Sequence, residues 1–292
     1  MTGILLIDKV PDWTSHDVVA KLRRLLGERR IGHAGTLDPM ATGLLTIFVG
    51  RATRAVAFAE AEEKTYITRL RLGLTTDTQD ITGQILAECE VAVSGEALEA
   101  VLPQFLGEIM QVPPMYSAVK VDGQRLYKLA RKGVTVERQA RPVTIHKITV
   151  LGQTEDGFDL EIVCSKGTYI RTLCHDIGQA LGCGGTMSAL RRTKVGAFSV
   201  ASALTLAALE ATEDRARLLQ PLDTLFAAYS ALTVDAAREC GIRNGQAVEV
   251  PSGEPGVYRV YGSDGTFLAL SEVVAGRQGL TLNTVKSFFA LL

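Results

Sequence analysis

The chain has 292 residues, of which 47% are hydrophobic, and its formal net charge is −1. This length and composition predict one large domain with a smaller companion and a substantial buried core. No apolar run reaches the roughly 18 residues of a membrane helix, and no secretory signal is visible, so we expect a cytoplasmic protein. Five cysteines without a Cys-x-x-Cys pair and four scattered histidines predict reduced thiols and no metal site.

The first third of the chain predicts strands and helices around one long loop. Residues 3–8 form an apolar run typical of a buried strand. Residues 14–17 read Thr-Ser-His-Asp, a capping-box start for a helix that ends at Gly27. Residues 32–43 hold three glycines and a proline, which favour a shaped loop over a packed helix or strand. Further elements are a strand over 44–49, a helix over 53–61 and a strand over 66–73.

The rest of the chain alternates helices with hairpin-like strands. We expect helices over 94–106 (kinked at Pro103), 124–132 (basic and amphipathic) and 167–182, a hairpin of strands 144–151 and 158–164, and a helical bridge over 202–219. Irregular alternation of this kind indicates an α+β fold on a mixed, mostly antiparallel sheet. Short β-like runs follow from about residue 230. We therefore expect a catalytic domain over residues 1–228 and a small β-rich domain over residues 229–292.

Basic residues gather in three places on this nearly neutral chain. Residues 120–147 hold eight basic residues against two acids, and smaller clusters lie at 21–30 and 191–194. A charge run is commonly a solvated face, but three clusters on a neutral chain fit a surface that follows RNA phosphates. The candidates for RNA-backbone contact, within a segment at about 110–147, are Lys120, Arg125, Lys128, Arg131, Lys132 and Arg141.

Residues 32–43 read Gly-His-Ala-Gly-Thr-Leu-Asp-Pro-Met-Ala-Thr-Gly. An isolated Asp-Pro is usually a plain turn, but this whole stretch closely resembles the aspartate loop of the TruB-type bacterial tRNA pseudouridine synthases. These enzymes isomerise the T-loop uridine at tRNA position 55. Further resemblances follow in order at residues 6–11, 64–66, 72–78, 113–120, 164–171 and 190–192. The resemblance covers about residues 3–200 and implies a large, mostly antiparallel sheet with flanking helices and a catalytic cleft across its middle.

The resemblance also implies the roles of individual residues. Asp38 is the expected nucleophile, acting on a nucleotide flipped out of its loop, and the isomerisation needs no cofactor. Arg171 is expected to pair with Asp38, because a forked cation keeps a carboxylate ionised in an apolar pocket. Tyr66 is expected to stack on the uracil and to take part in removal of the C5 proton, and Tyr169 to line the same pocket.

Three further residues belong to the substrate-binding set that the resemblance implies. His33 is expected to fill the gap left by the flipped nucleotide, and Leu190 to form a wall of the uracil pocket. Lys9 matches a family lysine, although Val10 displaces the following proline to position 11. Support of the loop and contact with RNA are both open roles for Lys9.

The sequence leaves several alternatives open. Asp38 could attack C1′ or C6, since both lie on the same nucleotide. The partner is expected to be the T stem-loop of tRNA, bound by a monomer without a protein partner. The alternatives are a related synthase with another RNA target, or an RNA-binding or tRNA-folding protein. Residues 32–35 fit neither a Walker loop nor a dinucleotide fingerprint.

Overall fold

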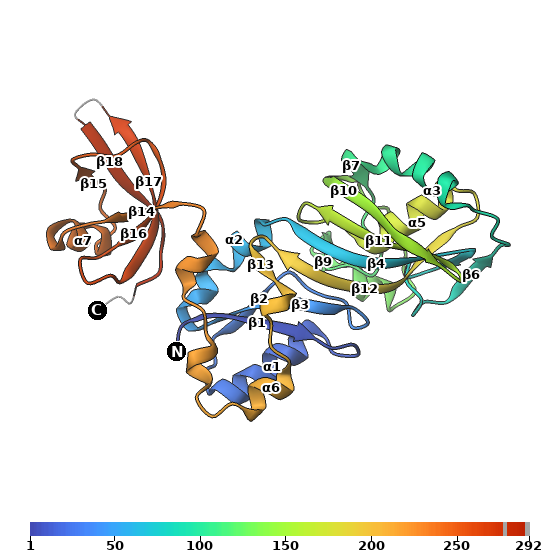
Figure 1. The fold of residues 1–292 in the computed structure, drawn as a ribbon, viewed down its shortest axis with the longest axis horizontal. Helices are drawn as coiled ribbons and strands as arrows, with labels where there is room; N and C mark the ends of the chain where they lie inside the picture. The colour runs from blue at the N-terminus through green and yellow to red at the C-terminus, as the bar shows by residue number, and fades with distance from the viewer. Residues whose placement is uncertain (277–278, 290–292) are drawn as a thin grey trace.

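The computed structural model describes residues 1–276 and 279–289, and within them the chain builds a nine-stranded sheet and a separate five-stranded sheet (Figure 1). The order in the large sheet is β1-β3-β12-β4-β11-β10-β7, with β2 beside β3 and β13 beside β12. Neighbouring strands are antiparallel except for β12 and β3, which run parallel. The expected α+β fold with a small C-terminal β-rich domain is confirmed.

The strands of the large sheet are β1 (Gly3–Lys9), β2 (Ile31–Ala34), β3 (Thr42–Val49), β4 (Lys64–Leu72), β7 (Gly107–Gln111), β10 (Arg141–Thr154), β11 (Gly157–Cys164), β12 (Gly185–Val195) and β13 (Phe198–Ser199). Two small hairpins are formed by β5 (Leu74–Thr76) with β6 (Ile85–Glu88) and by β8 (Lys120–Val121) with β9 (Gln124–Arg125). The C-terminal sheet contains β14 (Ser230–Thr233), β15 (Val248–Val250), β16 (Gly256–Tyr261), β17 (Phe267–Gly276) and β18 (Gly279–Ser287).

The α-helices of the described residues are short. They are α1 (Ser15–Leu26), α2 (Val56–Ala61), α3 (Gly95–Val101), α4 (Leu126–Ala130), α5 (Ile170–Ala180), α6 (Leu206–Ala211) and α7 (Ala236–Arg243). No helix in the described part of the chain is long and apolar enough to span a bilayer.

Local sequence explains the elements that frame the site. The predicted capping box of α1 is confirmed: Thr14 Oγ1 accepts from the Asp17 amide, and Asp17 accepts from the Thr14 amide. Gly27 ends the helix in the left-handed region, at φ 61°. In β4, buried residues alternate with more exposed ones, as expected of a strand with one face on the core. This alternation places Tyr66 on the buried face.

Three predicted spans are wrong in extent. Residues Ile31–Ala34 form β2 and pair with β3, so the loop is shorter than residues 32–43. The basic helix expected over 124–132 is reduced to α4, because Asp122 and Gly123, both at positive φ, turn the preceding residues into the β8–β9 hairpin. The helical bridge expected over 202–219 contains only the six residues of α6 and short 3₁₀ turns.

The C-terminal domain packs against the domain of the large sheet through a cluster rich in aromatic side chains. The ring of Phe226, which precedes β14, lies 5.3 Å from Phe58 of α2 and 5.6 Å from Phe288. The Phe267 ring stacks on Phe288 at 5.3 Å. These side chains belong to one buried cluster that joins the two sheets, so the small domain is held by a hydrophobic contact as well as by its linker.

Candidate active site

The loop between β2 and β3 carries Asp38 and is anchored to the start of α1. Ser15 Oγ accepts from the Leu37 amide at 2.9 Å and donates to the Leu37 carbonyl at 3.2 Å. Leu37 and Ala41, on either side of Asp38, are buried. The Ala41 amide donates to the Asp38 carbonyl at 3.0 Å, which closes a tight turn over Pro39. Asp38 therefore stands at the tip of a loop that is fixed at both sides.

Lys9, at the end of β1, stabilises this loop through hydrogen bonds from its side chain. Its side chain is 1% exposed, and Nζ donates to the carbonyls of Val10, Trp13 and Pro39 at 2.9, 2.7 and 3.0 Å. Burial lowers the pKa of Lys9 to about 8, against the opposing attraction of Asp38. Of the two roles left open by the sequence, the geometry favours support of the loop, because the ammonium group faces backbone carbonyls.

Arg171, in the first turn of α5, contacts Asp38 of the loop. Its Nε lies 3.0 Å from Asp38 Oδ2, and its Nη2 lies 3.4 Å from Oδ1. The other side of the guanidinium faces a second carboxylate, with Nη1 3.4 Å from Asp80 Oδ2. The Thr78 and Tyr116 carbonyls accept from the same group at 3.3 and 2.9 Å. One buried arginine thus bridges two carboxylates.

The two carboxylates differ in exposure. The Asp80 side chain is 6% exposed and accepts from Thr78 Oγ1 and from both the amide and the hydroxyl of Thr82. The Asp38 side chain is 34% exposed. Burial raises the pKa of Asp38, Arg171 opposes the rise, and Asp80 adds to it. Asp80 therefore orients Arg171, and Asp38 offers an accessible carboxylate to a ligand.

Tyr66 and Leu190 lie on neighbouring strands near this pair. Tyr66 is on β4, is 9% exposed, and has its pKa raised by burial. Leu190 is on β12, is 8% exposed, and pairs in register with Thr68, two residues from Tyr66. Both side chains belong to the same buried cluster as Leu37 of the loop. Together they form an apolar lining beside the carboxylate.

Tyr169 directly precedes α5, and two hydrogen bonds to its backbone fix its position. Gln111 of β7 accepts from the Tyr169 amide at 2.8 Å and donates to its carbonyl at 3.1 Å. Burial raises the pKa of the Tyr169 phenol, and the nearby Ser117 hydroxyl and Arg171 oppose the rise. Ser117 is 5% exposed. The phenol thus lies near Ser117 and Arg171.

His33 lies on β2, five residues before Asp38. Its ring meets that of His16 edge to face, with centroids 5.5 Å apart. Burial, aided by the charges of His16 and Arg192, lowers the pKa of His33 to about 4. The imidazole is therefore neutral at physiological pH. Its Nδ1 is buried without a hydrogen-bond partner among the described residues.

Two residues of the site were missed by reasoning from the sequence. Asp80 stands in a Thr-Asp-Thr-Gln-Asp stretch that resembles a polar turn, and its separation of 91 residues from Arg171 hid the ion pair. Arg192 was counted in a basic cluster, yet it is 1% exposed and donates to backbone carbonyls. Its neighbour Arg191 pairs with Asp8 at 2.7 Å. The cluster at 191–194 is therefore not a free phosphate-binding patch.

The six basic residues selected for RNA contact are all exposed. They lie on the β8–β9 hairpin, on and after α4, and at the start of β10. A hollow of about 560 Å³ opens among Lys120, Arg125, Lys128 and Lys132, beside Tyr127. The Arg131 guanidinium stacks over the Tyr127 ring at 5.5 Å. Two hydrogen bonds connect this segment to the site. The Ser117 carbonyl accepts from the Tyr127 amide, and the carbonyl of the adjacent Tyr116 accepts from Arg171.

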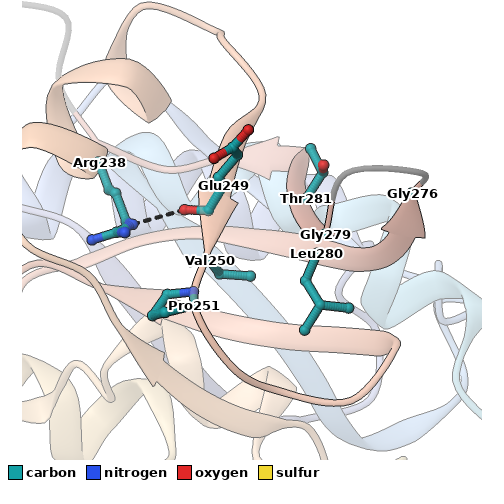
Figure 2. Close-up of a pocket in the computed structure, with 8 residues that line it drawn as sticks. All are labelled: Arg238, Glu249, Val250, Pro251, Gly276, Gly279, Leu280 and Thr281. Carbon is teal, nitrogen blue, oxygen red and sulfur yellow. Dashed lines mark hydrogen bonds between the residues drawn. The ribbon is translucent and has the colours of Figure 1, made fainter.

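A second hollow, of about 760 Å³, lies in the C-terminal domain (Figure 2). Arg238 donates to the Glu249 carbonyl at 2.7 Å on one side of it and pairs with Asp235. The opposite side is formed by Leu280 and Thr281 of β18. None of the sequence-selected site residues lines it. Within the described residues, no group of three or more His, Cys, Asp or Glu side chains could hold a metal ion.

The family models and the related proteins that match this chain all belong to the same family. Residues 23–170 match the TruB family pseudouridylate synthase N-terminal domain, and residues 171–227 match the tRNA pseudouridylate synthase B C-terminal domain. The chain is 45% identical to tRNA pseudouridine synthase B of Aromatoleum aromaticum, covering 92% of this chain and 88% of that protein. It is 47% identical to the protein of the same name from Ralstonia pickettii, covering 89% and 84%.

A solved structure with the same fold is titled as the crystal structure of a Cbf5-Nop10-Gar1 complex. It superimposes with a TM-score of 0.75 at 26% identity, covering 99% of this chain and 85% of that one. The matched domains cover the β2–β3 loop, β4 and the start of α5, which together carry Asp38, Tyr66 and Arg171. The chain therefore belongs to the TruB family of pseudouridylate synthases and is a tRNA-modifying isomerase.

Proposed function

We propose that this enzyme converts uridine to pseudouridine in the T loop of tRNA, at position 55, with Asp38 as the nucleophile. The observation that carries the proposal is the geometry of one carboxylate. Asp38 is held at 3.0 Å from a buried arginine and is still one-third exposed, at the tip of a fixed loop. Arg171 opposes the rise in the pKa of Asp38 that burial causes, and so favours the ionised carboxylate. The exposed part of that carboxylate can reach a nucleotide bound at the loop.

The reaction breaks the N1–C1′ bond of the nucleotide and forms a C5–C1′ bond, and the C5 proton is then lost. If Asp38 attacks C1′, it displaces the uracil from the ribose, and the surrounding side chains hold the free base while it turns; re-attack by C5 on C1′ then releases Asp38. If Asp38 attacks C6, it stays bonded to the base while the base turns and is released after the C5–C1′ bond forms. Tyr66 and Leu190, both nearly buried on adjacent strands, form the apolar surface on which the base rests. Tyr169 closes the Arg171 side. No step needs a redox cofactor.

The nucleotide has to leave the T loop before Asp38 can reach it, which costs a few kcal/mol. His33 is well suited to occupy the vacated space, because it is neutral and lies on the strand that leads into the Asp38 loop. The exposed cations of the segment from Lys120 to Arg141 offset the cost through phosphate contacts. Residues 1–228 carry this chemistry, and the small β-rich domain over residues 229–292 is a candidate for additional RNA contact.

The test is tritium release from tRNA transcripts labelled at uridine C5. Wild-type enzyme is expected to release tritium, whereas Asp38→Ala and a transcript with cytidine at position 55 are expected to release none. Binding of each transcript is measured in parallel. Release that persists in Asp38→Ala would refute the nucleophile, and release from the cytidine transcript would refute the T-loop site. Binding without any release would favour an RNA-binding or tRNA-folding protein.

A further inference from the structure

Arg192 is the largest fully buried side chain of the described residues, at 1% exposure. It lies on β12, outside the pair formed by Asp38 and Arg171. Its Nε donates to the Leu44 carbonyl at 2.7 Å, and its Nη2 donates to the Gly35 carbonyl at 3.1 Å. These two carbonyls flank the loop that carries Asp38. One guanidinium therefore ties together the incoming and outgoing ends of that loop.

The same side chain faces Tyr66. Arg192 and Tyr66 are directly opposite each other in the antiparallel register of β12 and β4, so their side chains share one face of the sheet. The Arg192 charge counters part of the rise in the pKa of the Tyr66 phenol. Its charge also adds to the lowering of the pKa values of His33 and Lys64 that burial causes. Arg192 thus lies between the Asp38 loop and the strand that carries Tyr66.

Two glycines of the loop make room for Arg192. A Cβ at Gly43 would lie 2.3 Å from the Arg192 carbonyl oxygen, a distance that backbone atoms cannot accommodate. A Cβ at Gly35 would lie 3.2 Å from Arg192 Nη1, and φ there is +77°. Gly43 is therefore needed for the close approach of the β3 and β12 backbones, and Gly35 leaves room for the end of the Arg192 side chain.

A buried cation is costly to retain unless it does something that an apolar residue cannot. Within residues 1–276 and 279–289, arginine forms ion pairs at positions 69, 71, 171, 191, 217, 238 and 243. Arg192 is not among them: its partners are two backbone carbonyls and the neutral Tyr66 side chain. An apolar side chain would fill the same space without this cost. What it could not do is bind two carbonyls with one rigid fork.

We propose that Arg192 is a positioning residue that fixes the distance between the Asp38 carboxylate and the Tyr66 ring. The proposal rests on the roles of Asp38 and Tyr66 in the proposed function. The nucleotide has to contact Asp38 and Tyr66 at the same time. Asp38 lies on a loop and Tyr66 on β4, and Arg192 contacts both elements. A shift of the loop end moves Asp38 relative to the base without removing any group that contacts the RNA.

The variants Arg192→Lys and Arg192→Gln test this. Lysine keeps the charge but cannot span both carbonyls, and glutamine loses the charge as well. Because a misplacement of about 1 Å can cost roughly 100-fold in rate, we expect the single-turnover rate at saturating tRNA to fall about 10-fold in the lysine variant and about 100-fold in the glutamine variant. The Kd for tRNA is expected to stay within about two-fold of the wild-type value, since the side chain is buried.

Arg215 supplies the matched control. Its guanidinium also donates to backbone carbonyls, those of Leu209, Leu25 and Glu210, and it links α6 to α1 away from the site. Arg215→Lys and Arg215→Gln are expected to lower the Tm and to leave the single-turnover rate of the folded enzyme unchanged. An NMR titration of His33 gives a second readout: in Arg192→Gln its pKa should rise above its wild-type value, because one of the two positive charges that add to the effect of burial is gone.

Four outcomes would overturn the proposal. The first is a wild-type single-turnover rate in folded Arg192→Gln, and the second is a loss of tRNA affinity in the Arg192 variants with the saturating rate intact. The third is an equal loss of rate in the Arg192 and Arg215 variants. The fourth is a His33 pKa that is unchanged in Arg192→Gln. Should the glutamine variant fail to fold, the lysine variant decides by the same rate and affinity criteria. A wild-type enzyme that binds tRNA but releases no tritium would instead refute the proposed function, and the His33 titration would still test the placement of Arg192.

Discussion

Replacing Arg171 and replacing Asp38 should have the same effect on activity and opposite effects on stability. Arg171→Gln removes the cation that opposes the raised pKa of Asp38, so a larger share of Asp38 is protonated and the nucleophile is lost. Asp38→Asn removes the nucleophile itself. Both variants are expected to release no tritium from labelled tRNA. Their free energies of unfolding, however, depend on which charges remain buried.

The magnitude for Arg171→Gln follows from its second partner. Asp80 and Arg171 are each only 6% exposed, so the substitution leaves a buried carboxylate without its cation. Breaking a buried pair in this way costs about 3–5 kcal/mol. The matched control is Arg69→Gln, which breaks the bidentate pair of Arg69 with Asp159 in the same sheet. Those side chains are 46% and 33% exposed, so we expect a cost of about 1 kcal/mol or less.

The sign for Asp38→Asn is set by its pKa. Burial raises the pKa of Asp38 above its ordinary value of 3.8, so between 3.8 and the raised pKa the folded state binds more protons than the unfolded state. Stability therefore falls as pH rises through that interval, and at pH 7 the charged carboxylate opposes folding. Asparagine removes this cost, and Arg171 keeps its pair with Asp80. We expect Asp38→Asn to be at least as stable as the wild type.

Urea unfolding at pH 7 measures all three variants, since the midpoint concentration reports stability when the slope is unchanged. The expected order of stability is Asp38→Asn, then Arg69→Gln, then Arg171→Gln. If Arg171→Gln unfolds at the same urea concentration as Arg69→Gln, the buried bridge between two carboxylates is not a stabilising element, and this reasoning fails. Residual tritium release from Asp38→Asn would separately refute its role as the nucleophile.

Three further predictions concern single features of the site. Tyr66→Phe should keep far more single-turnover activity than Tyr66→Ala if the ring acts by stacking, and equal losses in both would assign chemistry to the hydroxyl. The pKa of His33 is lowered from 6.5 to about 4, so the free energy of unfolding should fall as the pH drops from 6.5 to 4. Urea unfolding of His33→Gln should show a smaller fall over this range, and identical pH profiles for the two proteins would contradict the prediction. Neutralising Lys120, Arg125, Lys128 and Lys132 to Gln should weaken tRNA binding and reduce its log–log salt slope by about 3–4, and an unchanged slope would exclude phosphate contact there.

Prediction from the sequence succeeded where local pattern decides structure. The capping box of α1, the alternation in β4 and the hairpin of β10 with β11 depend on neighbouring residues, and all three are present. Prediction failed where the conformation of a segment depends on residues distant in the sequence. The strand β12 was missed because its residues alternate poorly, and it is held by register with β4 and β3 on its two sides.

The sequence by itself determined the family resemblance, the fold class and the candidate residues around Asp38, because these rest on residue identity and order along the chain. Only the tertiary structure decided what the buried charges do. Asp80 and Arg192 look in the sequence like a turn residue and a surface cation, yet folding places one behind Arg171 and the other between the Asp38 loop and Tyr66. Burial makes an ionic partner far more consequential than it is in water, and burial is fixed only when strands distant in sequence come together.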